Sequence, residues 1–121
     1  MASDLAIAVE DRPGQLAGIG EALGNAGVNI EGGFGSGSTG TIHVLVENAG
    51  EARKALEGAG YRVTDENEAM VFPAEDRPGF LGNAARKIAD AGVNIDHIYV
   101  ATNNRMVLIT KDVEAARRAI S

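Results

Sequence analysis

Apolar residues recur along this chain at two different spacings, and the two spacings alternate. Leu16, Ile19, Leu23 and Ala26 lie three or four residues apart, which is the spacing of one face of a helix. Runs rich in β-branched residues come before and after this segment, and such runs predict strands. The pattern predicts strands at 4–10, 28–33, 41–47 and 61–64 and helices at 14–26 and 51–59, in the order β-α-β-β-α-β.

The whole pattern then repeats. Asp-Arg-Pro-Gly at 11–14 returns at 76–79, and Ala-Gly-Val-Asn-Ile at 26–30 returns at 91–95, so the offset is 65 residues in both places. The second copy predicts strands at 69–74, 93–101 and 105–110 and helices at 79–91 and 113–120. Ser121 aligns with Glu57, so the second copy has no fourth strand. We therefore expect two units in tandem, 1–66 and 67–121.

The order of elements predicts an α+β fold. Right-handed crossovers in two interleaved β-α-β units give an antiparallel sheet of order 4-1-3-2 with both helices on one face, which is the ferredoxin-like arrangement. In the second unit the missing strand should leave segment 69–74 at an edge of the sheet. Pro73 agrees with this expectation, because proline is tolerated mainly in edge strands.

Composition narrows the classes of partner. The net charge of −6 opposes binding to nucleic acid, which depends on Lys and Arg, and the chain has no tryptophan to stack on bases. No apolar run approaches the ~20 residues of a membrane span. The N-terminus lacks the pattern of a signal peptide, and the absence of cysteine suits a cytoplasmic protein. His43 and His97 lie on different copies, so we expect no metal site, and His43 should be a partly exposed strand residue.

The repeated residues resemble a known family. A strand, then Asp-Arg-Pro-Gly-x-Leu, a helix and Ala-Gly-Val-Asn-Ile, in a β-α-β-β-α-β order, are similar to the ACT domain, an amino-acid-sensing module. Both copies carry the pattern, so the resemblance covers nearly the whole chain. It implies a tandem ACT-domain protein that binds an amino acid or related metabolite, without catalysis and without a cofactor, and regulates metabolism.

The resemblance implies a ligand site in the loop after the first strand and at the start of the second. A helix N-terminus there offers N–H groups to a carboxylate, and an Asp carboxylate can accept an α-ammonium group. The residues implied are Asp11, Gly14, Gln15, Leu16, Asn29 and Ile30 in the first copy and Asp76, Gly79, Phe80, Leu81, Asn94 and Ile95 in the second.

Each of these residues also has a purely structural interpretation. Asp11 and Asp76 can cap their helices, and Asn29 and Asn94 can shape the turn into the second strand. Leu16 and Leu81 are expected in the core rather than in a ligand wall. Arg12 and Arg77 are expected to be solvated or paired at the surface.

The segment Gly35–Gly40 matches the Gly-x-Gly-x-x-Gly pattern of dinucleotide sites. A strand follows it instead of the helix that such sites need, so we interpret it as a mobile hairpin loop able to fold over a ligand. Two other functions remain open. One is an oligomerisation or interaction module that binds no ligand, and the other is a small acyl-phosphate hydrolase with Arg12 as its phosphate binder, which fold analogy alone supports.

The expected connection between the copies leads to an expected oligomer. Residues 65–68 form the predicted linker, and it spans at most ~14 Å when extended. Pairing the second strands of both copies within one chain would require ~29 Å. We therefore expect that pairing to occur between chains, which makes a homodimer the ligand-binding form.

Overall fold

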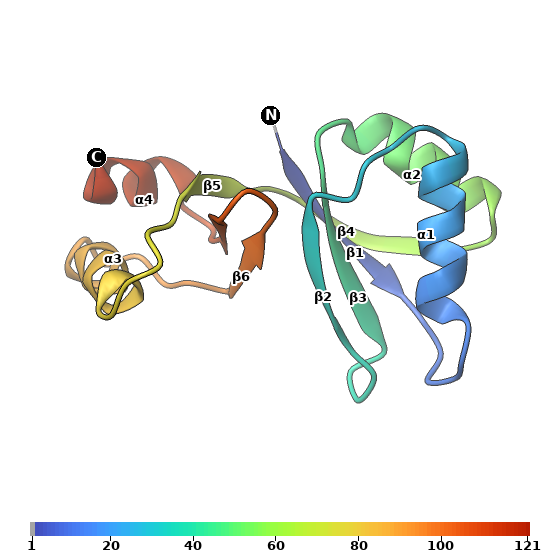
Figure 1. Cartoon of the computed structure of the whole chain (residues 1–121), viewed down its shortest axis with the longest axis horizontal. Coiled ribbons are helices and arrows are strands. Elements are labelled where there is room, and N and C mark those ends of the chain that lie inside the picture. Colours follow the sequence, from blue (N-terminus) through green and yellow to red (C-terminus); the bar gives the residue numbers. More distant parts are fainter. Residues whose placement is uncertain (1) are drawn as a thin grey trace. The chain divides into compact units, whose positions relative to one another are not determined.

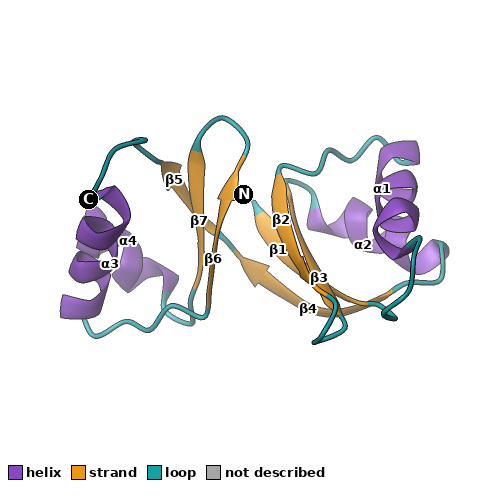
Figure 2. Ribbon diagram, turned by 60° about the horizontal axis from the view of Figure 1, so that its bottom comes forward, coloured by secondary structure: helices purple, strands orange, loops and turns teal. Residues whose placement is uncertain are grey.

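The computed structural model describes residues 2–121. The chain divides into two compact units, Met1–Glu68 (unit 1) and Ala69–Ser121 (unit 2). In each unit, helices cover one face of an antiparallel sheet (Figure 1 and Figure 2). The fold is therefore α+β, with two ferredoxin-like units in tandem and three strands instead of four in the second, as the sequence predicts.

Unit 1 has the complete set of elements. In chain order they are β1 (Ser3–Ala8), α1 (Gln15–Asn25), β2 (Gly32–Ser36), β3 (Thr41–Val46), α2 (Ala49–Gly58) and β4 (Arg62–Glu68). The strands lie in the order β4-β1-β3-β2. β1 pairs with β3 and with β4 over six residues each. Alternate residues of β1 and β3 therefore meet the helices, and Leu5, Ile7, Val44 and Val46 pack with Ile19, Leu23 and Leu56 in the core.

Unit 2 lacks the fourth strand. Its elements are β5 (Met70–Pro73), α3 (Phe80–Asp90), β6 (His97–Ala101), β7 (Arg105–Ile109) and α4 (Val113–Ile120). The strands lie in the order β6-β7-β5, so Pro73 sits in an edge strand as predicted. Met70, Ile88, Leu108 and Ala116 form the core under α3 and α4. Asn103 and Asn104, with φ of 61° and 54°, make the tight turn between β6 and β7.

The second strand of each unit begins later than the sequence predicts. Segment 28–33 was expected as a strand, but β2 begins at Gly32, and β6 begins at His97 instead of residue 93. Gly27, with φ of 74°, ends α1, and the Val28 N–H donates to the Leu23 carbonyl at 2.9 Å. Because of this hydrogen bond, Val28 continues the end of the helix and does not belong to the strand. Its side chain is buried in the core.

The predicted linker is also wrong. Residues 65–68 belong to β4, and Ala69 alone separates β4 from β5. The comparison of linker length with strand spacing therefore started from incorrect strand ends. The homodimer stays a prediction without that support.

The glycine-rich segment is only partly a loop, and its mobility stays a prediction. Gly35 and Ser36 complete β2, and only residues 37–40 form the turn to β3. A Cβ atom on Gly33 would lie 2.3 Å from the His43 carbonyl oxygen, so the close approach of β2 to β3 requires glycine there. As predicted, a strand and not a helix follows this segment.

His43 is buried, which corrects the expectation of a partly exposed residue. Its Nδ1 lies 2.7 Å from Oδ2 of Asp4, which is fully buried on β1. The Phe34 ring stacks on the imidazole with a centroid distance of 4.3 Å. This polar pair fixes β1 against β3 inside unit 1.

Candidate functional site

The helices that follow the repeated Asp-Arg-Pro-Gly segments begin without side-chain caps. α1 begins after Gly14 and α3 after Gly79, both in the left-handed conformation, and no side chain bonds to either first turn. By contrast, Asn48 caps α2 and Asp112 caps α4 through hydrogen bonds of 3.0 and 3.1 Å. The interpretation of Asp11 and Asp76 as helix caps is therefore wrong. The first turns of α1 and α3 keep N–H groups and partial positive charge for another acceptor.

In unit 1 a pocket of about 260 Å³ opens between the β1–α1 loop and the β2–β3 turn. Four of the residues implied by the sequence line it: Asp11, Gly14, Gln15 and Leu16. The sequence missed the opposite wall, which consists of Gly35–Gly37 and Ile42. The signal for that wall was the glycine-rich segment, whose small residues let the turn approach the loop. An adjoining pocket of about 280 Å³ shares Leu16, Gly35 and Ile42 and adds Ile30.

The charged groups of this pocket have distinct arrangements. Among residues 2–121 no group forms a hydrogen bond or ion pair with the Asp11 side chain. The turn lies close to this side chain, because a Cβ atom on Gly37 would be 3.2 Å from the Oδ1 atom of Asp11. Arg12 pairs with Glu10 at 2.8 Å in an exposed ion pair, as expected of a surface arginine. Gln15 Oε1 accepts the Glu10 N–H at 3.0 Å and so holds the loop against the helix. Asp11 is therefore the acidic group that a ligand would meet.

Leu16 and Leu81 are not in the core, contrary to expectation. Their exposed fractions are 64 % and 50 %. Each follows the first residue of its helix. Leu16 instead forms an apolar wall shared by the pockets of about 260 and 280 Å³.

Asn29 does not join Asp11. It follows the C-terminal end of α1, whereas Asp11 precedes the N-terminal end, and an 11-residue helix is about 16 Å long. Asn29 is exposed and lines neither pocket, while Ile30 lines the adjoining one. Five of the six residues implied in unit 1 thus line these two adjoining pockets, which together are called the groove of unit 1.

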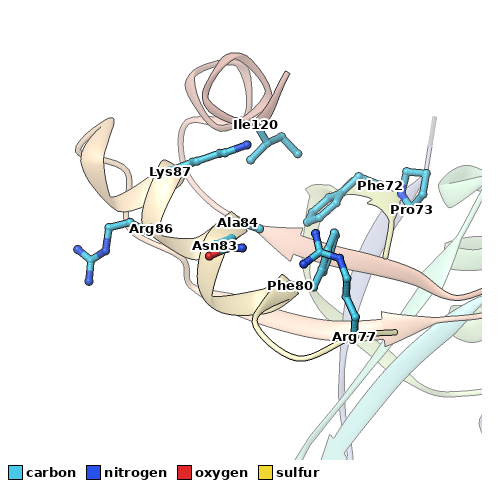
Figure 3. Close-up of a pocket in the computed structure, with 9 residues that line it drawn as sticks. All are labelled: Phe72, Pro73, Arg77, Phe80, Asn83, Ala84, Arg86, Lys87 and Ile120. Atoms are coloured by element: carbon cyan, nitrogen blue, oxygen red, sulfur yellow. The ribbon is translucent and has the colours of Figure 1, made fainter. Parts of the chain in front are cut away.

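Unit 2 does not gather its six residues. Phe80 packs at 6.4 Å from Phe72 in a pocket of about 630 Å³ on the β5 side of α3 (Figure 3). Asn94 lines a separate pocket of about 310 Å³, and Ile95 packs against the core. Neither pocket is lined by Asp76, Gly79 or Leu81. The repeated segment alone therefore does not create the groove found in unit 1.

Comparisons with known proteins agree with this fold. Residues 72–119 match the family model of the ACT domain. A search of curated protein sequences gives no match. Among solved structures, a protein of Bacteroides thetaiotaomicron superposes with a TM-score of 0.80 at 21 % identity, covering 98 % of this chain and 85 % of that one.

Two further structures are regulatory subunits of aspartate kinase. The ligand-free subunit from Thermus thermophilus superposes with a TM-score of 0.70 at 22 % identity and covers 98 % of this chain and 88 % of its own. The subunit from Thermus flavus gives 0.64 at 24 % identity, covering 98 % and 90 %. At these identities the likeness concerns the fold. Residues 72–119 of unit 2 thus match the ACT domain, and the internal repeat and the shared fold are consistent with an ACT-domain protein.

Proposed function

We propose that this chain is a regulatory module that binds an amino acid or a similar small zwitterion in the groove of unit 1. The observation that carries the proposal is that two opposite charges lie beside one pocket. The uncapped first turn of α1 presents N–H groups and partial positive charge, and the Asp11 carboxylate lies on the loop that precedes it. An α-carboxylate fits the first group and an α-ammonium fits the second.

The size and walls of the groove suit a small ligand. Pockets for drug-sized ligands measure about 300–1,000 Å³, and the two adjoining pockets here lie at or below the lower end of that range. Leu16 and Ile42 offer an apolar wall for the ligand side chain, while Gly35 and Gly37 leave room beside it. The two structural relatives named as regulatory subunits of aspartate kinase agree with a regulatory role.

The experiment is a thermal-shift screen of the twenty amino acids, followed by calorimetry with any that raises the melting temperature. A ligand at 100 times its Kd adds about 2.7 kcal/mol to the free energy of unfolding, so moderate binding is detectable. Asp11→Asn keeps the shape of the side chain and removes its charge. It should weaken binding by about 1.5–3 kcal/mol, the range for a hydrogen bond to a charged group.

Asp76→Asn is the matched control, because Asp76 has the same local sequence but lines no comparable groove. It should leave the affinity unchanged. If no amino acid shifts the melting temperature at millimolar concentration, or if both variants bind like the parent protein, the groove of unit 1 is not an amino-acid site. If the chain binds its ligand as a monomer, the expectation that a homodimer is the ligand-binding form is wrong.

A further inference from the structure

Glycine occupies the positions of β2 whose side chains would face the helices of unit 1. Residues directly opposite each other in an antiparallel pair share one face of the sheet. Gly33 lies opposite Val44, which belongs to the core under the helices. Gly35 lies opposite Ile42, which packs against that core. The helix-covered face of β2 therefore has glycine where a strand normally carries core side chains.

Unit 2 carries aliphatic side chains at the same two positions. Ile98 lies opposite Leu108, a core residue of that unit. Val100, two residues later, lies on the same face of the sheet. At the 65-residue offset of the repeat, Ile98 corresponds to Gly33. Val100 corresponds in the same way to Gly35, so unit 1 lacks two aliphatic side chains that unit 2 has.

The pocket of about 280 Å³ lies beside these glycines. Gly33 and Gly35 line it, and its apolar walls include Leu16, Ile30 and Ile42. A Cβ atom on Gly35 would lie 3.4 Å from Cγ1 of Ile42, so a side chain at that position would contact the wall. The three wall residues are incompletely buried and keep apolar surface that a ligand can cover.

The walls of this pocket offer no charge to a ligand. Among the described residues that line it there is no Asp, Glu, Lys or Arg, and His43 has the only polar side chain. The Nδ1 atom of His43 is already held 2.7 Å from Oδ2 of Asp4. An ammonium or carboxylate group that entered the pocket would lose its hydration without meeting an opposite charge on the walls. An aliphatic group carries no such cost.

The two pockets of the groove are continuous enough for one small molecule. They share Leu16, Gly35 and Ile42, while Asp11 lines only the pocket of about 260 Å³. A ligand whose charged groups lie beside Asp11 therefore has its side chain directed over Leu16 into the apolar pocket.

We propose that this side chain is aliphatic, so that the ligands of the groove are valine, leucine and isoleucine. The inference rests on the amino-acid site proposed above. The ligand side chain takes the space over Ile42 that a side chain on Gly35 would take, and that Val100 supplies from the sequence in unit 2. Leu16, Gly35 and Ile42 determine the specificity.

The test is calorimetric titration of the full chain with single amino acids. Valine, leucine and isoleucine should each bind at least about tenfold more tightly than alanine, because each buried CH₂ group contributes about a fourfold gain in affinity. Lysine and aspartate should bind at least about tenfold more weakly than leucine, because their charged ends would be desolvated.

Leu16→Ala removes part of the apolar wall and should weaken leucine binding about fivefold to tenfold. Alanine binding should change less than about threefold, since its methyl group covers little of the wall. Leu16 is exposed, so its truncation leaves the core intact. Leu81→Ala is the matched control, because Leu81 is the exposed counterpart in unit 2 and lines neither pocket of the groove. It should change leucine affinity by less than about twofold.

Gly35→Val introduces the residue that unit 2 has and should fill the pocket. Leucine should then bind no more tightly than alanine, and the circular dichroism melting curve shows whether the variant is folded. If it is not folded, Leu16→Ala decides the question. The inference is overturned if Leu81→Ala weakens leucine binding as much as Leu16→Ala, or if folded Gly35→Val keeps the preference for leucine.

Two outcomes separate this inference from the amino-acid site on which it rests. If no amino acid binds, both fail. If lysine, aspartate or phenylalanine binds more tightly than the aliphatic amino acids, the site stands and the aliphatic specificity is wrong. Asp11→Asn should weaken leucine and alanine by the same factor, because it acts on the groups that all amino acids share. Leu16→Ala should instead reduce the ratio of their affinities.

Discussion

Ile7 and Phe72 hold equivalent positions on the first strands of the two units, but only Ile7 is fully buried. Both strands lead into the same Asp-Arg-Pro-Gly segment and an uncapped helix, so local sequence does not explain the difference. The difference comes from β4, which closes one side of unit 1 and has no counterpart in unit 2. Repeating a segment reproduces the local backbone, while burial depends on elements distant in sequence.

The second strands show the opposite kind of difference. β2 reads Gly-Gly-Phe-Gly-Ser, and β6 at the equivalent positions reads His-Ile-Tyr-Val-Ala. The glycines let β2 approach β3 closely and leave backbone without side chains along the proposed ligand groove. At the equivalent positions of β6, Ile98 and Val100 are 40 % and 60 % exposed. In unit 1 the β4 side of the sheet is covered by a strand, and β2 carries few side chains. In unit 2 the corresponding side has no strand, and β6 carries large side chains.

The largest expected effect compares the side of unit 1 that β4 covers with the side of unit 2 beside β5, where no strand lies. Leu56→Ala in unit 1 should lower the free energy of unfolding by about 3 kcal/mol, since it removes a fully buried side chain. Ile120→Ala at the equivalent position should cost about 1 kcal/mol, because that side chain is already half in solvent. Urea denaturation followed by circular dichroism measures both. Equal losses would mean that the side of unit 2 beside β5 is as well covered as that of unit 1.

A second expected effect tests the close approach of β2 to β3. Gly33→Ala should cost about 2 kcal/mol, because its Cβ atom would lie 2.3 Å from the His43 carbonyl oxygen. Ile98→Ala, at the equivalent position of β6, should cost about 0.5 kcal/mol, as expected for an exposed side chain. The same denaturation measurement compares them. A neutral Gly33→Ala variant would show that the two strands separate easily.

The smallest expected effect concerns the glycines of α1. Nothing lies within 4 Å of a Cβ atom on Gly20 or Gly24, so Gly20→Ala and Gly24→Ala should each stabilise the chain by about 1 kcal/mol. Gly18→Ala should destabilise it, because the Tyr61 hydroxyl would have to move. In the parent protein, amides of residues 14–26 should exchange faster than those of 79–91, and both stabilising variants should reduce the difference. Stabilisation by Gly18→Ala would remove the packing role given to Tyr61.

The sequence by itself determined the order of elements, the repeat, the edge position of Pro73 and the loop that carries Asp11. These features follow from residue spacing and turn chemistry, which act over a few residues. It misplaced the start of β2 and the end of β4, since glycine has little intrinsic preference for strands and only pairing with β3 holds Gly32–Ser36 in place.

Only the tertiary structure decided which predicted site residues meet. The Asp-Arg-Pro-Gly segment and Val-Asn-Ile recur at one spacing in both units, yet Asp11 and Asn29 lie at opposite ends of α1. The wall opposite Asp11 comes from Gly35–Gly37, which no spacing rule connects to it. The buried Asp4–His43 bond likewise joins residues 39 positions apart. Contacts of this kind depend on how strands pair across the sheet, and pairing brings together residues whose local sequences carry no information about each other.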